Sequence, residues 1–313
     1  MQALDGFSYH AARGFLSHLL DEIPDRDRLD GELLTVLGQP RKAYWTRNVW
    51  EHPLVIEFAS VGEAAEALRA IQRNWAPCPS RLHRRSALIA ERLPPLPSKP
   101  KPFPFDLPDT PMGAFMLIDE NSMLASPTCS SPFPNGEFEF EEDKEGPPSR
   151  AYRKLWEALV LAGKWPGAAD RCLDAGAAPG GWTWALAQLG ASVLAIDRAA
   201  LEPRIAQMPG VEFRKGDAFA LKPEDVGAVD WLFSDVICYP GALLEWVERW
   251  LASGLAHNFI CTIKMQGEGP DRATTERFAA IPGSRVLHLW HNRHELCWIK
   301  VEGDRGLGSP TRS

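Results

Sequence analysis

Paired cysteines, long apolar runs and an excess of basic charge are all missing from this sequence of 313 residues. Its six cysteines are scattered without a C-x-x-C pair, which argues against a zinc site and against a disulfide framework. No stretch approaches the roughly 18 apolar residues of a membrane span. The N-terminus lacks the basic start and apolar core of a signal peptide. We therefore expect a protein of the reducing cytoplasm that does not contact a membrane.

The net charge of −7 does not by itself indicate a nucleic-acid binder, but charge is unevenly distributed along the chain. Residues 73–101 hold seven basic residues against one acid, and residues 137–145 hold six acids against one lysine. The basic segment predicts either a face for RNA or a solvated linker. Its candidates for RNA contact are Arg73, Arg81, Arg84 and Arg85.

Two shifts in composition divide the chain. Ten prolines between residues 77 and 111 predict a stiff, extended connector without a helix, and an acidic run ends at Pro147 and Pro148. The expected parts are an α+β domain over 1–76, a linker with further strands over 77–146, an α/β domain over 147–303 and a disordered tail over 304–313.

Local patterns predict few regular elements in the N-terminal part. Apolar residues at helical spacing indicate helices over residues 7–23 and 61–75. A short apolar run indicates a strand over residues 54–58, and two more strands are expected over residues 114–118 and 136–140. These elements would form a small domain with both helices and strands.

From residue 150 on, strands and helices alternate, which is typical of a parallel sheet with helices on both faces. The last two strands are close in sequence and should form an antiparallel hairpin at the edge. The expected strands are 171–175, 192–197, 211–215, 229–235, 257–264, 285–290 and 295–301, and the expected helices are 150–162, 181–190, 241–253 and 271–280. We thus predict a Rossmann-like, seven-stranded α/β fold whose ligand lies at the carboxyl ends of the strands.

The segment D-A-G-A-A-P-G-G-W-T, residues 174–183, reads as a strand, a glycine-rich turn and the start of a helix. It lacks the G-x-G-x-x-G fingerprint of dinucleotide sites, because Ala178 replaces a glycine and Pro179 removes a backbone donor. A nucleoside without phosphates fits better. Asp197 ends the next strand, where an acid can bind ribose hydroxyls, and Asp217 follows the third strand, where a carboxylate can reach an adenine amine. Either acid could instead cap a helix.

This glycine turn resembles the first motif of the FtsJ-type (RrmJ-type) ribose 2′-O-methyltransferases, which are recognised by a Lys-Asp-Lys-Glu tetrad. The string S-R-A-Y-R-K, ending at Lys154, resembles the opening motif of that family. The string D-W-L-F-S-D, ending at Asp235, resembles its fourth-strand motif. The resemblance therefore supplies the first two members of the tetrad.

The other two members follow in the same order. The string K-M-Q-G-E-G, which starts at Lys264, resembles the fifth-strand stretch with one residue fewer before the glutamine. The string H-N-R-H-E-L resembles the last motif and supplies Glu295. The resemblance implies a class I methyltransferase fold with S-adenosylmethionine as cofactor. The residues expected to bind it are Asp174, Gly176, Ala178, Pro179, Gly180, Gly181, Trp182, Asp197, Asp217 and Asp235.

A second resemblance concerns the substrate. The string S-S-P-F-P-N-G, residues 130–136, followed by P-S-R, residues 148–150, is similar to the RlmM-type 23S rRNA cytidine 2′-O-methyltransferases, which carry an N-terminal THUMP domain. It implies that Arg150 contacts RNA and that the partner is 23S rRNA or a ribosome-assembly precursor. This chain is shorter than that family before residue 114. A monomer is expected.

Chemistry gives the tetrad a role. A ribose hydroxyl is a poor nucleophile, so methyl transfer needs in-line positioning and a base. A lysine with an ordinary pKa is protonated at neutral pH, but burial and a second ammonium would lower its pKa. We therefore expect Lys264 to act as the base, Asp235 to lie beside the methyl–oxygen line, and Lys154 and Glu295 to support them. Taken alone, Lys154 lies off the apolar stripe of its helix, as a solvated lysine would.

Three other functions remain as alternatives. An RNA cytosine-C5 methyltransferase would attack the base with Cys238, although the proline expected before that cysteine is Ile237. A non-catalytic RNA-binding factor and a small-molecule methyltransferase are further alternatives. Trp45 and Trp50 lie near basic residues and are the best candidates for stacking on RNA bases.

Overall fold

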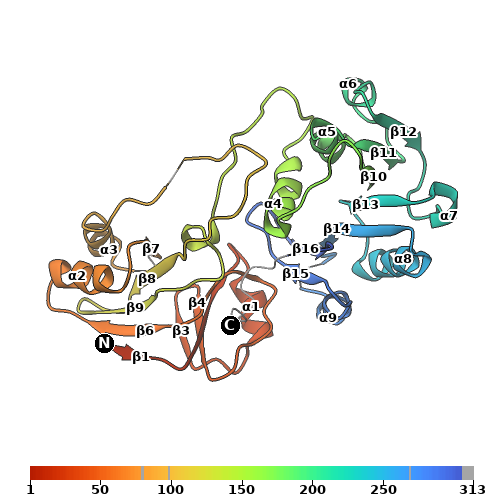
Figure 1. Ribbon diagram of the computed structural model, residues 1–313. Coiled ribbons are helices and arrows are strands. Elements are labelled where there is room, and N and C mark those ends of the chain that lie inside the picture. Colours follow the sequence, from red (N-terminus) through yellow and green to blue (C-terminus); the bar gives the residue numbers. More distant parts are fainter. Residues whose placement is uncertain (79–80, 98, 268, 305–313) are drawn as a thin grey trace. The chain divides into compact units, whose positions relative to one another are not determined.

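The computed structural model describes residues 1–78, 81–97, 99–267 and 269–304 and divides into two compact units. Unit 1 consists of Met1–Lys101 and Leu107–Glu139. Unit 2 consists of Pro102–Asp106 and of the described residues from Phe140 on. Each unit has its own sheets and helices, and each is described by itself (Figure 1).

Unit 2 contains a seven-stranded sheet in the order β12-β11-β10-β13-β14-β16-β15. The first five of these pair in parallel, whereas β16 runs antiparallel between β14 and β15. The predicted parallel strands and the antiparallel hairpin at the edge are confirmed. The strands are β10 (Arg171–Ala175), β11 (Ser192–Asp197), β12 (Val211–Lys215), β13 (Val229–Ser234), β14 (Ala256–Lys264), β15 (Arg285–Leu287) and β16 (Glu295–Lys300).

The helices of unit 2 connect these strands, as the alternating pattern predicts. β13 and β14 are buried along almost their whole length, which is typical of strands covered by helices on both faces. The longest helix begins at Pro240 and ends before Gly254, whose positive φ of 67° stops it. The helices are α4 (Tyr152–Ala162), α5 (Gly181–Gln188), α6 (Pro203–Ala206), α7 (Pro223–Val226), α8 (Pro240–Ser253) and α9 (Arg272–Ala279).

Unit 1 contains a five-stranded sheet in the order β1-β6-β9-β8-β7 and a four-stranded sheet in the order β3-β4-β2-β5. Its strands are β1 (Gln2–Ala3), β2 (Gly6–Ala11), β3 (Arg28–Asp30), β4 (Leu33–Leu37), β5 (Thr46–Trp50), β6 (Leu54–Glu57), β7 (Trp75–Pro77), β8 (Gly113–Leu117) and β9 (Ser122–Ser126). Its helices are α1 (Leu16–Glu22), α2 (Val61–Ile71), α3 (His83–Ala90) and the 3₁₀ turn η1 (Pro134–Gly136).

The predicted helix over residues 7–23 is wrong in its first half. Residues 6–11 form β2, which pairs with β4 on one side and β5 on the other. Inside it, the hydroxyls of Ser8 and Thr35 lie 2.7 Å apart in a buried hydrogen bond. The helical spacing around Leu19 is real, but it belongs to the short helix α1 alone. Pairing with distant strands therefore overrides the local pattern.

Three further expectations need correction. Helix α2 ends at Ile71, because Trp75 begins β7 and its indole donates to the carbonyl of Leu68 at 2.9 Å. The proline-rich connector contains α3, which falls in a stretch free of proline between Pro79 and Pro94. Residues 136–140 do not form a strand, since η1 ends at Gly136 and irregular chain follows.

The expected stacking role of two tryptophans is wrong as well. Trp45 and Trp50 are fully buried, and Trp50 packs in a core cluster with Leu33 and Met116. Their rings are therefore not available to RNA bases.

Two of the expected domain borders can be compared with the structure. The five-stranded sheet combines β6 and β7 with β8 and β9, so the border at residue 76 does not separate two sheets. Asp304 of the predicted tail binds Arg285 at 2.8 and 3.1 Å, and residues 305–313 lie outside the described part. All six cysteines are free thiols. Within the described ranges, no helix has the length and hydropathy needed to cross a membrane.

Candidate active site

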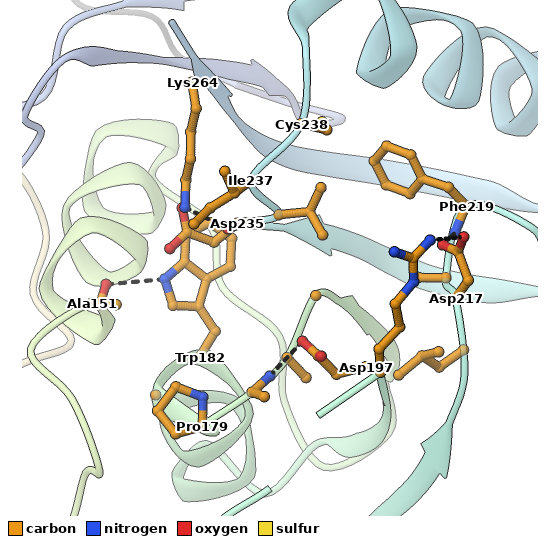
Figure 2. Close-up of a pocket in the computed structure, with 18 of the residues that line it drawn as sticks. Ala151, Pro179, Trp182, Asp197, Asp217, Phe219, Asp235, Ile237, Cys238 and Lys264 are labelled. Carbon is orange, nitrogen blue, oxygen red and sulfur yellow. Dashed lines mark hydrogen bonds and ion pairs between the residues drawn. The ribbon is translucent and has the colours of Figure 1, made fainter. Parts of the chain in front are cut away.

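A cavity of about 460 Å³ lies at the carboxyl edge of the unit 2 sheet. Its walls are the segments that follow β10, β11, β12 and β13, together with Lys264 at the end of β14. This is the edge at which open α/β sheets bind ligands. The predicted cofactor residues that line it are Gly176, Ala178, Pro179, Gly181, Trp182, Asp197, Asp217 and Asp235 (Figure 2).

Two glycines of the turn are needed because neighbouring chain packs against them. Gly176 has a φ of +82°, and a Cβ there would lie 2.4 Å from Cγ2 of Val236. A Cβ on Gly181 would lie 2.5 Å from the hydroxyl oxygen of Ser149. A side chain at either position would displace its neighbour. The glycines therefore bring the turn against the loop after β13 and against the segment before α4.

Asp197 both supports the turn and faces the cavity. Its carboxylate accepts the backbone N–H of Ala178 at 3.0 Å and that of Ala199 at 2.8 Å (Figure 2). The helix-capping alternative is wrong for Asp197, because both donors lie in turns outside α5 and α6. Because Asp197 also lines the cavity, its remaining lone pairs can accept hydroxyl groups of a ligand.

Asp217 lies on the wall that follows β12. Its carboxylate accepts hydrogen bonds from the Arg198 guanidinium at 2.5 Å and from the Phe219 N–H at 3.0 Å. The hydrogen bond from Arg198 is the main reason why the pKa of Asp217 is lowered. Arg198 and Phe219 also line the cavity, although no motif predicts either residue there.

Asp174 and Gly180 were expected to bind the cofactor but do not line the cavity. Asp174 is fully buried behind the turn, where it accepts the Thr183 hydroxyl at 2.6 Å, and burial raises its pKa to about 7. Gly180, with a φ of +116°, is the residue before α5. Both support the turn from outside the cavity wall.

The four residues of the expected tetrad come together at one end of this cavity. The ammonium of Lys154 lies 2.9 and 3.1 Å from the two carboxylate oxygens of Asp235 and 2.8 Å from Oε1 of Glu295. The Lys264 ammonium lies 3.2 Å from Oδ1 of Asp235 and donates to the backbone carbonyl of the same residue at 2.6 Å. One carboxylate oxygen is thus shared by two ammonium groups.

The topology of the sheet explains why residues so distant in sequence meet. β13 and β14 are parallel neighbours, so Asp235, which follows β13, lies near Lys264 at the end of β14. β16 is antiparallel to β14, and its first residue, Glu295, is the direct partner of Lys264. Lys154 reaches the group from α4. Glu268, in the motif that starts at Lys264, lies outside the described residues.

The environment of Lys154 is that of a buried ion pair and not that of a solvated lysine. Its side chain is 11% exposed, and those of Asp235 and Glu295 are 16% and 11% exposed. Burial by itself would lower the pKa of Lys154, but the two carboxylates outweigh it and the pKa is raised. Lys154 therefore keeps its proton at neutral pH and acts as a fixed positive charge.

With this geometry established, comparison with known proteins identifies the segment around the glycine turn. Residues 147–256 match the FtsJ-like methyltransferase family. The match contains the glycine turn, Lys154 and Asp235, while Lys264 and Glu295 lie beyond it. The resemblance expected from the motifs is confirmed, as is the α/β fold of the Rossmann-like class I methyltransferases.

Several curated relatives of the chain carry the same name. "Ribosomal RNA large subunit methyltransferase M" of Halorhodospira halophila is 36% identical over 156 residues, which are 48% of this chain and 45% of that protein. The protein of the same name from Alkalilimnicola ehrlichii is 29% identical over 304 residues, 91% of this chain and 77% of that one. The chain spans about half the length of the first of these relatives.

Among solved structures, fibrillarin from Aeropyrum pernix with bound S-adenosyl-L-methionine is 17% identical. The similarity covers 59% of this chain and 81% of that chain, with a TM-score of 0.35.

The FtsJ-like segment also contains a buried glutamate that sequence analysis missed. Glu157, one turn after Lys154 on α4, accepts the backbone N–H groups of Trp290 and His291 at 2.7 and 3.0 Å. It also lies 2.6 Å from Nδ1 of His291. These contacts fix α4 to the loop that leads into Glu295. The only signal in the sequence is a carboxylate on the apolar face of a helix.

The arginines expected to contact RNA are divided between the units. Arg150, in the segment just before α4, binds Glu142 at 2.5 Å. In unit 1, Arg84 and Arg85 lie on α3, and the Arg85 guanidinium lies 5.6 Å from the centre of the Phe58 ring. Arg73 and Arg81 are exposed. A shared RNA-binding role for these residues remains a prediction.

Proposed function

We propose that this protein is an S-adenosylmethionine-dependent methyltransferase that methylates a ribose 2′-hydroxyl of large-subunit ribosomal RNA. The observation that carries the proposal is the meeting of Lys154, Asp235, Lys264 and Glu295 at one end of the cavity built on the glycine turn. A cofactor site and a cluster of proton-transferring groups thus share one wall, Asp235 and Lys264 belonging to both.

The cavity fits a nucleoside with a charged, phosphate-free tail. The Asp197 carboxylate suits a pair of ribose hydroxyls, and Asp217 beside Phe219 suits an adenine ring with its amine. In the turn, Pro179 has no N–H and the N–H of Ala178 already binds Asp197, so fewer donors face a pyrophosphate than in a dinucleotide site. S-adenosylmethionine would supply an electrophilic methyl group, and the chain's own residues would position it toward the tetrad.

The tetrad would then handle the substrate hydroxyl. The hydroxyl oxygen would form a bond to the methyl carbon as the bond from that carbon to sulfur breaks, and Lys264, as a neutral amine that has released the proton of its ammonium form, would accept the hydroxyl proton. Asp235, which contacts both lysines, orients Lys264 toward the hydroxyl. The protonated Lys154 holds Asp235 and Glu295 in place and offsets part of their negative charge.

The substrate class is inferred from the relatives and from unit 1. The relatives above are named as methyltransferases of large-subunit ribosomal RNA. We infer a 23S rRNA cytidine, in free RNA or in an assembling particle, as the target. Unit 1 would act as the RNA-binding, THUMP-like module, with Arg73, Arg81, Arg84 and Arg85 on RNA phosphates. The protein would act as a cytoplasmic monomer.

One experiment tests the reaction and the substrate together. Purified protein is mixed with methyl-labelled cofactor and rRNA from cells that lack the gene, and 2′-O-methyl positions are then mapped. We expect label at one ribose of the large-subunit RNA and none with Lys264→Ala. Label on a base would contradict ribose transfer. Cofactor binding without transfer to any RNA would favour a non-catalytic RNA-binding factor.

A further inference from the structure

Large apolar side chains that stay exposed are few, and in unit 2 they fall on one loop. Among the residues that the structure describes, the large exposed hydrophobic side chains of unit 2 are Ile237 and Tyr239, which are 79% and 73% exposed. They follow Asp235 by two and four residues. Exposed apolar groups clustered beside a reaction site indicate a surface that a partner covers.

The backbone of this loop is fixed although its side chains are exposed. Val236 packs against Gly176, where there is no room for a Cβ. The carbonyl of Tyr239 accepts the N–H groups of Ala242 and Leu243 at 3.0 and 3.2 Å and so caps α8. The loop is held on both sides of Ile237. Its side chains are therefore presented to solvent by a rigid support, which lowers the entropic cost of binding.

The position of the loop relative to the tetrad limits what can cover it. Ile237 lines the same cavity as Asp235 and Lys264, and Figure 2 shows its side chain beside Asp235. In a nucleotide, the carbon that bears the 2′-hydroxyl is bonded to the carbon that bears the base. When the 2′-hydroxyl lies at Lys264, the base of the same nucleotide therefore lies about one sugar ring away, near Ile237.

We propose that Ile237 and Tyr239 form a platform on which the base of the target nucleotide stacks, out of its RNA helix. The platform rests on the proposed function, since a ribose substrate is what puts a base at this place. Aromatic and apolar side chains stack on unpaired bases of every kind, because each base has a π-face. The platform would therefore position the ribose without selecting the nucleotide.

The test replaces the ring and leaves the rest of the loop unchanged. Tyr239→Ala should raise the KM for the rRNA fragment that the wild type methylates by about tenfold, and Tyr239→Phe should keep the wild-type KM, because stacking needs the ring and not the hydroxyl. Leu37→Ala, which removes an exposed apolar side chain of unit 1, is the matched control and should keep the wild-type KM. Binding of S-adenosylhomocysteine, measured by calorimetry, should be the same in all four proteins.

A second measurement separates this proposal from the reaction itself. Binding of a short, labelled oligocytidylate, followed by fluorescence anisotropy, should weaken about tenfold in Tyr239→Ala and stay unchanged in Tyr239→Phe. If the wild type methylates no ribose, the proposed function fails and this binding assay still tests the platform. The platform is overturned if Tyr239→Ala binds the oligocytidylate as the wild type does, or if Tyr239→Phe weakens binding as much as Tyr239→Ala.

Discussion

Each unit buries a group of charged side chains beside a cavity. In unit 2 this is the tetrad, in which two ammonium groups share one oxygen of Asp235. In unit 1 it is the Arg47 cluster, which lines a second cavity. There the Arg47 guanidinium lies 2.6 Å from both Glu137 and the His10 ring and 3.5 Å from Glu32.

The two groups differ in whether a proton can move. The arginine guanidinium does not lose its proton in proteins. Burial, with a smaller contribution from Arg47, lowers the pKa of His10 to about 3, so that its ring stays neutral. The Arg47 cluster is therefore a fixed structural network. In the tetrad Lys154 is likewise a fixed charge, but Lys264 is an amine that can exchange its proton, and it lies on the wall of the proposed cofactor cavity. Burial and ion pairing alone do not distinguish an active site from a structural one.

The largest expected effect comes from removing the amine of Lys264. Lys264→Ala should lower methyl transfer at least about 100-fold, because positioned acid–base groups contribute that much or more. Transfer of labelled methyl groups to rRNA measures the effect, and calorimetry should show unchanged cofactor binding. Lys215, which likewise ends a parallel strand but is exposed, supplies the control variant Lys215→Ala. Full turnover by Lys264→Ala would show that the tetrad, like the Arg47 cluster, is structural and does not transfer a proton.

Removing the cation of the other cluster should affect stability and not chemistry. The Arg47 side chain is 10% exposed, and Arg47→Met would leave Glu137 and His10 without their partner. We expect the free energy of unfolding to fall by about 2 kcal/mol, less than for a fully buried pair because Glu137 is partly solvated. Thermal unfolding measures it. Arg41→Met, which breaks an exposed pair with Asp25, should leave the unfolding temperature nearly unchanged.

The pH dependence of stability tests the same cluster at His10. Because its pKa is near 3 in the folded state and near 6.5 in the unfolded chain, only the unfolded chain takes up a proton between these values. The wild type should therefore lose stability as pH falls from about 6.5, and His10→Gln should lose less over the same range. Melting temperatures from pH 7 to pH 4 test this. His257→Gln, at an exposed histidine, should follow the wild type.

The same two regions show what the sequence could predict. In unit 2, β10 and β11 are short, largely apolar runs with a glycine close by, and strands β10 to β12 fall at the predicted residues. Once the strand order is known, Asp235, Lys264 and Glu295 must meet, because they end or begin neighbouring strands. Local sequence patterns predict the strands, and the regular connections of parallel sheets then determine which strand ends are neighbours.

Unit 1 depends on contacts that no local pattern contains. Arg47 binds His10 across 37 residues and Glu137 across 90 residues. The pattern predicts a helix at β2 because the apolar residues of β2 are followed directly by those of α1. Only the pairing of β2 with β4 and β5 shows that this segment is a strand. Arginine, histidine and glutamate at such separations look like surface residues in a sequence. These residues form a buried cluster because the two sheets of unit 1 bring them together.

The smallest expected effect concerns Cys238, which lines the cofactor cavity and would be the nucleophile of a cytosine-C5 methyltransferase. Burial raises the pKa of this thiol to about 11, although Lys264 opposes the shift, so the reactive thiolate is scarce at neutral pH. Cys238→Ala should therefore keep methyl transfer within about twofold of the wild type. The product of both proteins, analysed as nucleosides, should carry the methyl group on the ribose. A hundredfold loss with methyl groups on cytosine C5 would transfer the chemistry to the thiol and leave Lys264 with a structural role, as Arg47 has in unit 1.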